Sequence, residues 1–75
     1  MKRDVPLQSR LASNMRRLRS ERTWTQADVA DRCGMVCQAV QRIEACRTGI
    51  SLKTLARLAD AFGVDAADLL AREGE

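Results

Sequence analysis

Three cysteines and a short polar run are the residues of this chain whose types and spacing could do chemistry. Cys33 and Cys37 are separated by three residues, and Gln38, Gln41 and Arg42 follow them. Two thiols at this spacing could form half of a metal or redox site. Glutamine and arginine, in contrast, are the side chains that bond purine edges bidentately, Gln to adenine and Arg to guanine. The segment therefore belongs either to a thiol site or to a surface that reads nucleic acid.

The number of available ligands argues against a metal. A zinc site takes about four ligands, and the chain has three Cys and no His, so acidic residues or a second copy would have to complete it. We therefore expect no metal and no other cofactor. A thiol beside Arg or at a helix N-terminus can ionise, so a redox role of Cys37 or Cys46 stays open beside the plainer interpretation as surface cysteines.

The charge of the chain is divided unevenly along its length. Residues 1–57 carry 12 of the 13 Lys and Arg and 5 of the 10 Asp and Glu, whereas residues 58–75 carry one Arg and five acidic residues. A basic body with an acidic end suits a polyanion-binding face and a separate end that is kept away from the polyanion. The alternative is a solvated surface with an accidental asymmetry.

Caps and apolar spacing predict an all-α fold of five helices in one domain, residues 1–75. The first helix carries an apolar stripe that is expected to pack, formed by Leu7, Leu11, Met15 and Leu18. The expected helices run from about Pro6 to Glu21, Thr25 to Cys33, Val36 to Ala45, Ser51 to the stop at Gly63, and Asp65 to about Arg72.

Neither a membrane nor an enzymatic role is indicated. The chain has no run of about 18 apolar residues, and its basic start lacks the apolar segment of a signal peptide, so a cytoplasmic location is expected. The chain has no His and no Gly-rich phosphate loop, and its serines have no neighbouring base. We therefore expect a binding protein and not an enzyme.

Helical geometry divides the third helix, about Val36–Ala45, into two faces. At about 100° per residue, one face is apolar and is expected to pack: Ala39, Val40 and Ile43. The opposite face is expected to be exposed: Cys37, Gln38, Gln41 and Arg42. Such a face on a basic domain predicts a recognition helix, in which these four residues contact DNA bases.

Residues 25–44, TQADVADRCGMVCQAVQRIE, resemble the helix-turn-helix of the lambda-repressor/Cro-like family of bacterial and phage transcription regulators. With Gln26 as the first motif position, the small fifth residue is Ala30 and the ninth-position glycine is Gly34. The apolar positions, from the fourth to the eighteenth, hold Val29, Cys33, Met35, Val40 and Ile43. The resemblance extends over roughly residues 8–72 and places the helix-turn-helix at about 25–45.

The resemblance implies a transcription regulator that binds a palindromic operator in double-stranded DNA as a homodimer. It would act in the bacterial or phage-infected cytoplasm, at the nucleoid, by blocking RNA polymerase or by contacting it. The short chain further resembles the controller proteins of restriction–modification systems. Two alternatives remain, namely an antitoxin-like interaction module, whose acidic end binds a basic partner, and a thiol-based redox-sensing regulator.

Further residues are assigned to contacts around the recognition helix. Thr25 and Gln26 begin the second helix, where free amides and the positive helix end favour phosphate. The resemblance implies that Arg47 and Thr48 hold the DNA backbone on the other side. It also implies a structural ion pair between Arg19 and Glu44, and Glu44 lies at the edge of the packed face, where it needs a partner.

A dimer contact is expected at the C-terminal end of the chain. The fourth and fifth helices alone cannot cover every apolar side chain there, which leaves Val64, Ala66 and Leu70 for a partner. A two-fold pairing at this end would set two recognition helices about 34 Å apart, the distance between successive major grooves.

Three positions depart from the pattern of the family. Val36 stands where the family usually has a Ser or Thr cap for the recognition helix. Cys46 stands where glycine commonly ends that helix, and Thr23 stands where glycine often precedes the second helix. Each departure is expected to lower local stability without changing the fold.

Overall fold

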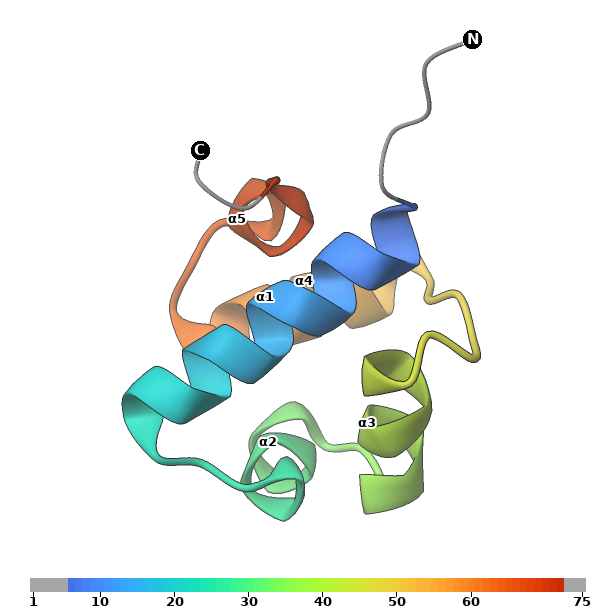
Figure 1. Ribbon diagram of the computed structural model, residues 1–75. Coiled ribbons are helices and arrows are strands. Elements are labelled where there is room, and N and C mark those ends of the chain that lie inside the picture. The colour runs from blue at the N-terminus through green and yellow to red at the C-terminus, as the bar shows by residue number, and fades with distance from the viewer. Residues whose placement is uncertain (1–5, 73–75) are drawn as a thin grey trace, which may run out of the picture.

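The computed structural model describes residues 6–72, which form five helices and no strand. These are α1 (Leu7–Arg22), α2 (Gln26–Cys33), α3 (Cys37–Glu44), α4 (Leu52–Phe62) and α5 (Ala66–Leu70). Figure 1 shows α1 and α4 in the middle of the molecule, with α2 and α3 on one side and α5 on the other. The expected all-α, five-helix fold is confirmed. The last helix ends at Leu70, earlier than expected from the sequence.

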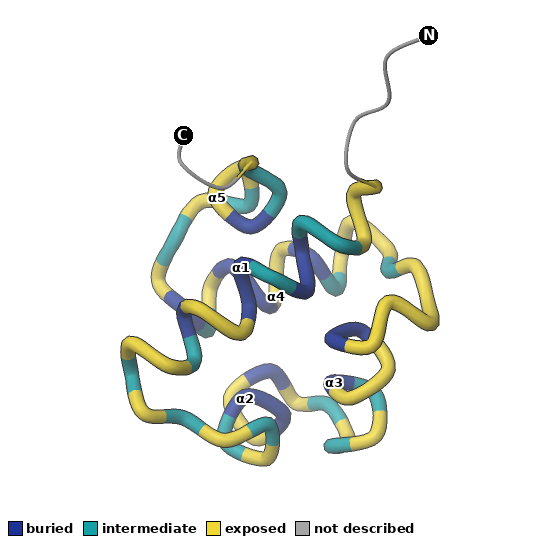
Figure 2. Tube along the Cα trace, in the orientation of Figure 1, coloured by how far each residue is buried: buried dark blue, intermediate teal, exposed yellow. Residues whose placement is uncertain are grey.

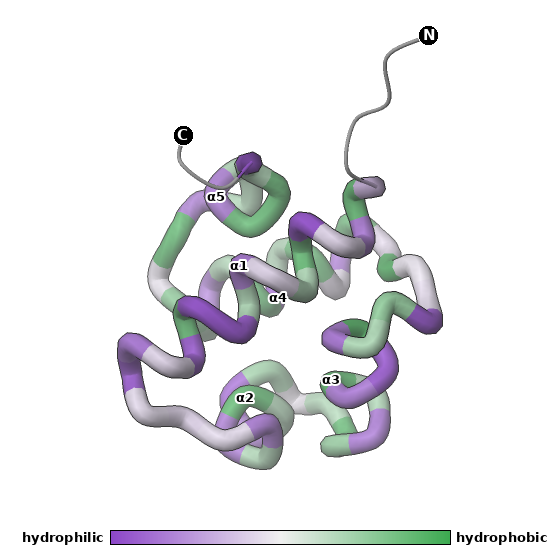
Figure 3. Tube along the Cα trace, viewed as in Figure 1, coloured by the Kyte–Doolittle hydropathy of each residue, from purple (hydrophilic) through white to green (hydrophobic). Residues whose placement is uncertain are grey.

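The core lies between the helices, and each of the five contributes to it. Met15, Val29, Val40, Leu58 and Leu69, one from each helix, are fully buried. Figure 2 shows buried segments of every helix turned toward the centre, and Figure 3 shows that many of these segments are hydrophobic. Of the apolar stripe expected on α1, Leu11, Met15 and Leu18 are buried as predicted. The prediction is wrong for Leu7, which is 56 % exposed.

Local signals explain where α2 begins and ends. The Thr25 hydroxyl accepts a hydrogen bond from the Asp28 N–H at 3.1 Å, and the Asp28 carboxylate accepts one from the Thr25 N–H at 2.8 Å. This reciprocal arrangement is a capping box, and the bond from the Thr25 backbone lowers the pKa of Asp28. Gly34 then ends the helix with φ of 68°, a left-handed conformation that glycine adopts without strain.

The early end of α5 follows from a buried amide on α1. Asn14 is 3 % exposed, and its Nδ2 donates to the carbonyl oxygens of Leu69 and Ala71, each at 2.9 Å. The side chain therefore binds carbonyls at the end of α5 that would otherwise continue the helical ladder. Ala71 is extended, with φ of −68° and ψ of 149°. Asn14 is thus the residue that fastens the end of α5 to α1.

Two residues without the freedom of glycine occupy left-handed positions. Thr23, after α1, has φ of 57°, and Cys46, after α3, has φ of 59°. These are two of the positions at which the sequence departs from the glycines of the family. The left-handed conformation costs a residue with a Cβ roughly 1–2 kcal/mol. Both turns are therefore strained by their side chains.

We expect Thr23→Gly to raise the free energy of unfolding by about 1 kcal/mol, because glycine relieves this strain but adds entropy to the unfolded chain. Ser20→Gly is the matched control, since Ser20 is exposed and lies within α1. Glycine inside a helix should lower stability by about 0.5 kcal/mol relative to serine. Urea unfolding of both variants checks the signs. Two changes of the same sign would contradict the account of strain at Thr23.

Candidate nucleic-acid interface

The outward face of α3 presents three polar side chains. Gln38, Gln41 and Arg42 are exposed, while Val40 and Ile43 on the opposite side are 0 % and 2 % exposed. The buried side packs α3 against α2 and α1, so the polar face is held on a rigid element. Its side chains can donate and accept hydrogen bonds in the geometry that base edges require.

Cys37 differs from its three neighbours on this face. The sequence places it with the exposed residues, but the structure has it half-buried and packed against the hydrophobic core. The Nε2 of Gln41 lies 3.8 Å from its sulfur. The expectation of a fully outward thiol is therefore wrong, because the first turn of α3 lies against the core at this point.

The side chains at the start of α2 are engaged within the protein. The Thr25 hydroxyl belongs to the capping box, and Gln26 Nε2 donates to Glu44 Oε1 at 3.0 Å. The backbone N–H groups of the first turn of a helix have no intrahelical acceptor. A phosphate at this end would therefore be bound mainly by backbone amides. The side chain of Gln26 is held by its hydrogen bond to Glu44.

On the other side of α3, an exposed loop carries Arg47 and Thr48. The Thr48 hydroxyl donates to the Gly49 carbonyl at 3.0 Å. Arg42 lines an open hollow together with Thr48 and Thr54. Arg42 thus lies on the side of α3 that faces this loop.

The structure brings Arg19 and Glu44 together as a bidentate pair. Arg19 Nε lies 2.7 Å from Glu44 Oε2, and Arg19 Nη2 lies 2.8 Å from Oε1. Glu44 is 3 % exposed, and its hydrogen bond raises the pKa of Arg19. Arg19 also donates to the Trp24 carbonyl at 3.1 Å, before α2. One arginine of α1 therefore joins the end of α3 to the chain that enters α2.

Two members of this network are not indicated by the sequence. Arg16 donates to the backbone carbonyl of Glu44, and Gln26 binds the Glu44 carboxylate. Arg16 lies three residues before Arg19 on α1, so the two side chains share one face of the helix. This spacing is the sequence signal that could have suggested the contact of Arg16 with α3. Two arginines of α1, Arg16 and Arg19, thus hold the end of α3.

The N-terminus of α3 has no side-chain cap, as the departure at Val36 suggested. Val36 has φ of −81° and ψ of 150°, makes no side-chain capping bond, and is 66 % exposed. We expect Val36→Ser to raise the free energy of unfolding by about 0.5–2 kcal/mol. Val36→Ala is the control, because alanine also lacks an acceptor. Equal thermal midpoints for the two variants would contradict the capping account.

The cysteines do not form a shared site. Cys33 is buried, with its Sγ 3.9 Å from the Arg57 carbonyl, and burial raises the pKa of its thiol. Cys46 is exposed, 3.7 Å from the Gln8 carbonyl. Within residues 6–72, no three Cys, Asp or Glu side chains come together as metal ligands. The Cys33–Cys37 segment is a joint between α2 and α3.

The residues expected at a dimer contact are only partly accessible. Val64, Ala66 and Leu70 are each half-buried and packed against the core. Leu70 also lines an open apolar groove with Leu7 and Leu52. Leu52, the first residue of α4, is 83 % exposed. None of the helices in residues 6–72 has the length and apolar character that crossing a membrane requires.

Residues 10–72 of this chain match the sequence model of a helix-turn-helix domain family. The chain belongs to this family, and the resemblance drawn from residues 25–44 is confirmed. It is 38 % identical over 64 residues to the Neisseria hypothetical transcription factor from Neisseria meningitidis serogroup B, an alignment that covers 85 % of this chain and 60 % of that protein.

Solved structures share the fold. The crystal structure of the hypothetical transcription factor NHTF from Neisseria has a TM-score of 0.87 at 32 % identity, over 97 % of this chain and 88 % of that one. The restriction-modification controller protein C.AhdI from Aeromonas hydrophila has a TM-score of 0.78 at 22 % identity, over 83 % and 94 % of the two chains. At the latter identity the likeness concerns the fold alone.

Proposed function

We propose that this chain is a sequence-specific DNA-binding regulator of transcription that acts as a homodimer on a palindromic operator. The observation that carries the proposal is the exposed Gln38, Gln41 and Arg42 face of α3, held in place by buried contacts on a basic domain. The family and the relatives named as transcription factors support it.

In the proposed complex, α3 enters the major groove and its outward residues meet base edges. Cys37 contributes at most from the edge of this face, since it is half-buried. The amides at Thr25 and Gln26 meet phosphate on one side, and Arg47 and Thr48 meet phosphate on the other. Phosphate contacts position the protein, whereas contacts with base edges select the sequence.

A homodimer would double this interface on two half-sites. Its two-fold axis would relate the C-terminal ends, including Val64, Ala66 and Leu70, and keep their acidic residues away from phosphate. The regulator would act in the bacterial or phage-infected cytoplasm, as one domain over 1–75, either by blocking RNA polymerase or by contacting it. A controller of restriction–modification genes is one form that such a regulator takes.

One observation favours a thiol-sensing form of the same function. Cys46 is exposed at the end of α3, beside Arg47 in the sequence. Modification of its sulfur would place bulk or charge next to the loop that is proposed to bind phosphate. An antitoxin-like role, in contrast, would be revealed by a basic partner that co-purifies from the native host.

Selection of bound duplexes from a random pool tests the proposal. We expect an enriched site with dyad symmetry and half-sites about one helical turn apart. Enrichment of a site without a dyad would contradict the homodimer, and no enrichment would contradict sequence-specific binding. The enriched sequence also identifies the genes that lie beside it, including any restriction–modification genes.

A further inference from the structure

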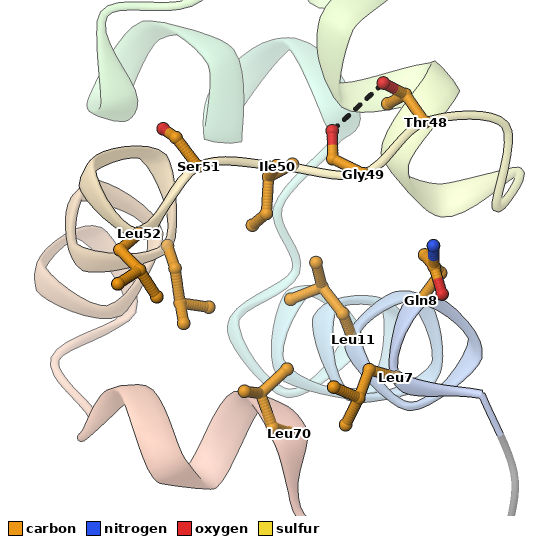
Figure 4. Close-up of a pocket in the computed structure, with 10 residues that line it drawn as sticks. Leu7, Gln8, Leu11, Thr48, Gly49, Ile50, Ser51, Leu52 and Leu70 are labelled. Atoms are coloured by element: carbon orange, nitrogen blue, oxygen red, sulfur yellow. Dashed lines mark hydrogen bonds between the residues drawn. The ribbon is translucent and has the colours of Figure 1, made fainter.

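The large hydrophobic side chains that are strongly exposed within residues 6–72 fall into two groups. Leu7 and Leu52 line one open apolar groove, where Figure 4 shows them together with Leu11 and Leu70. Val36 is 66 % exposed and stands directly before α3, and it is not among the residues that line this groove. An isolated exposed valine is ordinary on a protein surface. Its place in the fold therefore decides what it can do.

The backbone around Val36 is fixed on both sides. Met35 and Cys37 are partly buried and pack against the hydrophobic core. The Val36 carbonyl accepts a hydrogen bond from the Ala39 N–H at 3.0 Å, in the first turn of α3. Because valine is β-branched, its side chain is also stiff about χ1. The isopropyl group is thus held in solvent at the N-terminal end of α3, and it would lose little freedom on meeting a partner.

We propose that Val36 determines specificity by contacting the C5-methyl group of one thymine in each half-site of the operator. The inference rests on the proposed function, since it requires α3 to lie in the major groove. In that arrangement the N-terminal residues of the recognition helix contact base edges. Val36 lies two residues before Gln38, at the end of α3 that enters the groove.

Thymine is the base whose chemistry matches this side chain. In the major groove each base presents hydrogen-bond donors or acceptors, and thymine also presents a methyl group. Valine offers no side-chain donor or acceptor, so against a purely polar edge it would displace water without replacing its hydrogen bonds. A methyl group packed on the isopropyl group, in contrast, removes apolar surface of both partners from water.

The position of Val36 gives its side chain no role inside the protein. It stands where the family usually has a Ser or Thr cap, and it makes no side-chain capping bond to α3. Its isopropyl group is also outside the buried core. Departures from a local structural rule are expected at functional sites, where stability is given up for a contact. The thymine contact supplies such a role.

Uracil in place of thymine tests the contact, because the replacement removes one methyl group and keeps every hydrogen-bonding group of the base pair. The probe is the duplex enriched by selection, with each thymine of the half-site and its symmetry mate replaced in turn by deoxyuridine. At one position we expect the wild type to lose affinity roughly fourfold per half-site, the effect of losing one buried methyl group. At the same position Val36→Ser should bind both duplexes within about 1.5-fold, since the pair of substitutions removes a single shared contact.

Leu52→Ser is the matched control, because it makes the same kind of change at an exposed aliphatic residue outside the polar face of α3. It should keep the wild-type loss at that position, since surface substitutions away from a contact are nearly neutral. All three proteins meet the same duplexes, so an effect of uracil on the shape of the DNA cancels in the comparison. Circular dichroism verifies that each variant is folded.

The outcomes separate this inference from the proposed function. Uracil replacements that change the affinity of the wild type and of Val36→Ser by equal factors at every position overturn the inference, and sequence-specific binding stands. An enriched site without thymine in its half-sites has the same meaning, as does loss of the uracil effect in Leu52→Ser. A pool from which no duplex is enriched overturns the proposed function and the thymine contact together.

Discussion

Replacing Arg19 with methionine is expected to lower the free energy of unfolding by about 3–5 kcal/mol, because the substitution leaves a buried carboxylate without its partner. Glu44 is 3 % exposed, and the guanidinium of Arg19 binds both of its oxygens. Gln26 alone would remain on the carboxylate. The loss would appear as a lower urea midpoint with an unchanged slope.

The same helix provides the matched control for this prediction. Arg17 pairs with Glu21 at 3.2 Å, but both side chains are about half exposed, at 52 % and 54 %. An exposed pair contributes about 0–1 kcal/mol, so Arg17→Met should change stability little. The double variant Arg19→Met with Glu44→Leu should recover part of the loss, since no lone charge stays buried. Similar losses for Arg17→Met and Arg19→Met would refute the structural role of the pair.

The second large effect is expected in DNA binding and separates base reading from backbone anchoring. Arg42→Ala should cost about 1–3 kcal/mol on the best operator and relax preference at one base pair of each half-site. Arg47→Ala should weaken all duplexes alike and lower the salt slope by about one per subunit, because one fewer counterion is released. Affinities of both variants on operator and scrambled duplex, at two salt concentrations, distinguish the two roles.

The position of Arg42 makes this experiment informative. Arg42 lies at the edge of the polar face, beside the loop that carries Thr48. The rival role is that of a second phosphate anchor, with Gln38 responsible for most of the sequence preference. If Arg42→Ala weakens binding to operator and scrambled DNA by the same factor, Arg42 is an anchor. Gln38→Ala should then relax the preference instead.

The sequence predicts those features that depend on neighbouring residues. Thr25 and Asp28 lie three residues apart, and together they define the start of α2 without any knowledge of the rest of the chain. The alternation of faces on α3 places Val40 inside and Gln38 outside for the same reason. Arg19 and Glu44 are 25 residues apart, and their pairing was accessible only through the resemblance to a family.

Features that depend on distant contacts could not be predicted. Asn14 binds carbonyls 55 and 57 residues further along the chain, so its spacing carries no signal for the role. Leu7 has the spacing of a core residue, but it lies in the first turn of α1 and is 56 % exposed. The Gln26 side chain binds Glu44, 18 residues further along the chain, and its spacing carries no signal for this contact. In each case tertiary packing decides what a local pattern leaves open.

The fastening of α5 by Asn14 also determines how the native protein opens. An isolated helix of five residues is unstable in water, so α5 is helical only while it is docked on α1. Detachment of α5 is therefore a local unfolding step that costs less than global unfolding. Helix α3, held by α1 and α2, would keep its amide protons protected from solvent exchange during this step. A second copy of the chain that covers Leu70 would slow the detachment of α5. Hydrogen exchange in α5 would then become slower as the protein concentration rises, while exchange in α3 would not change.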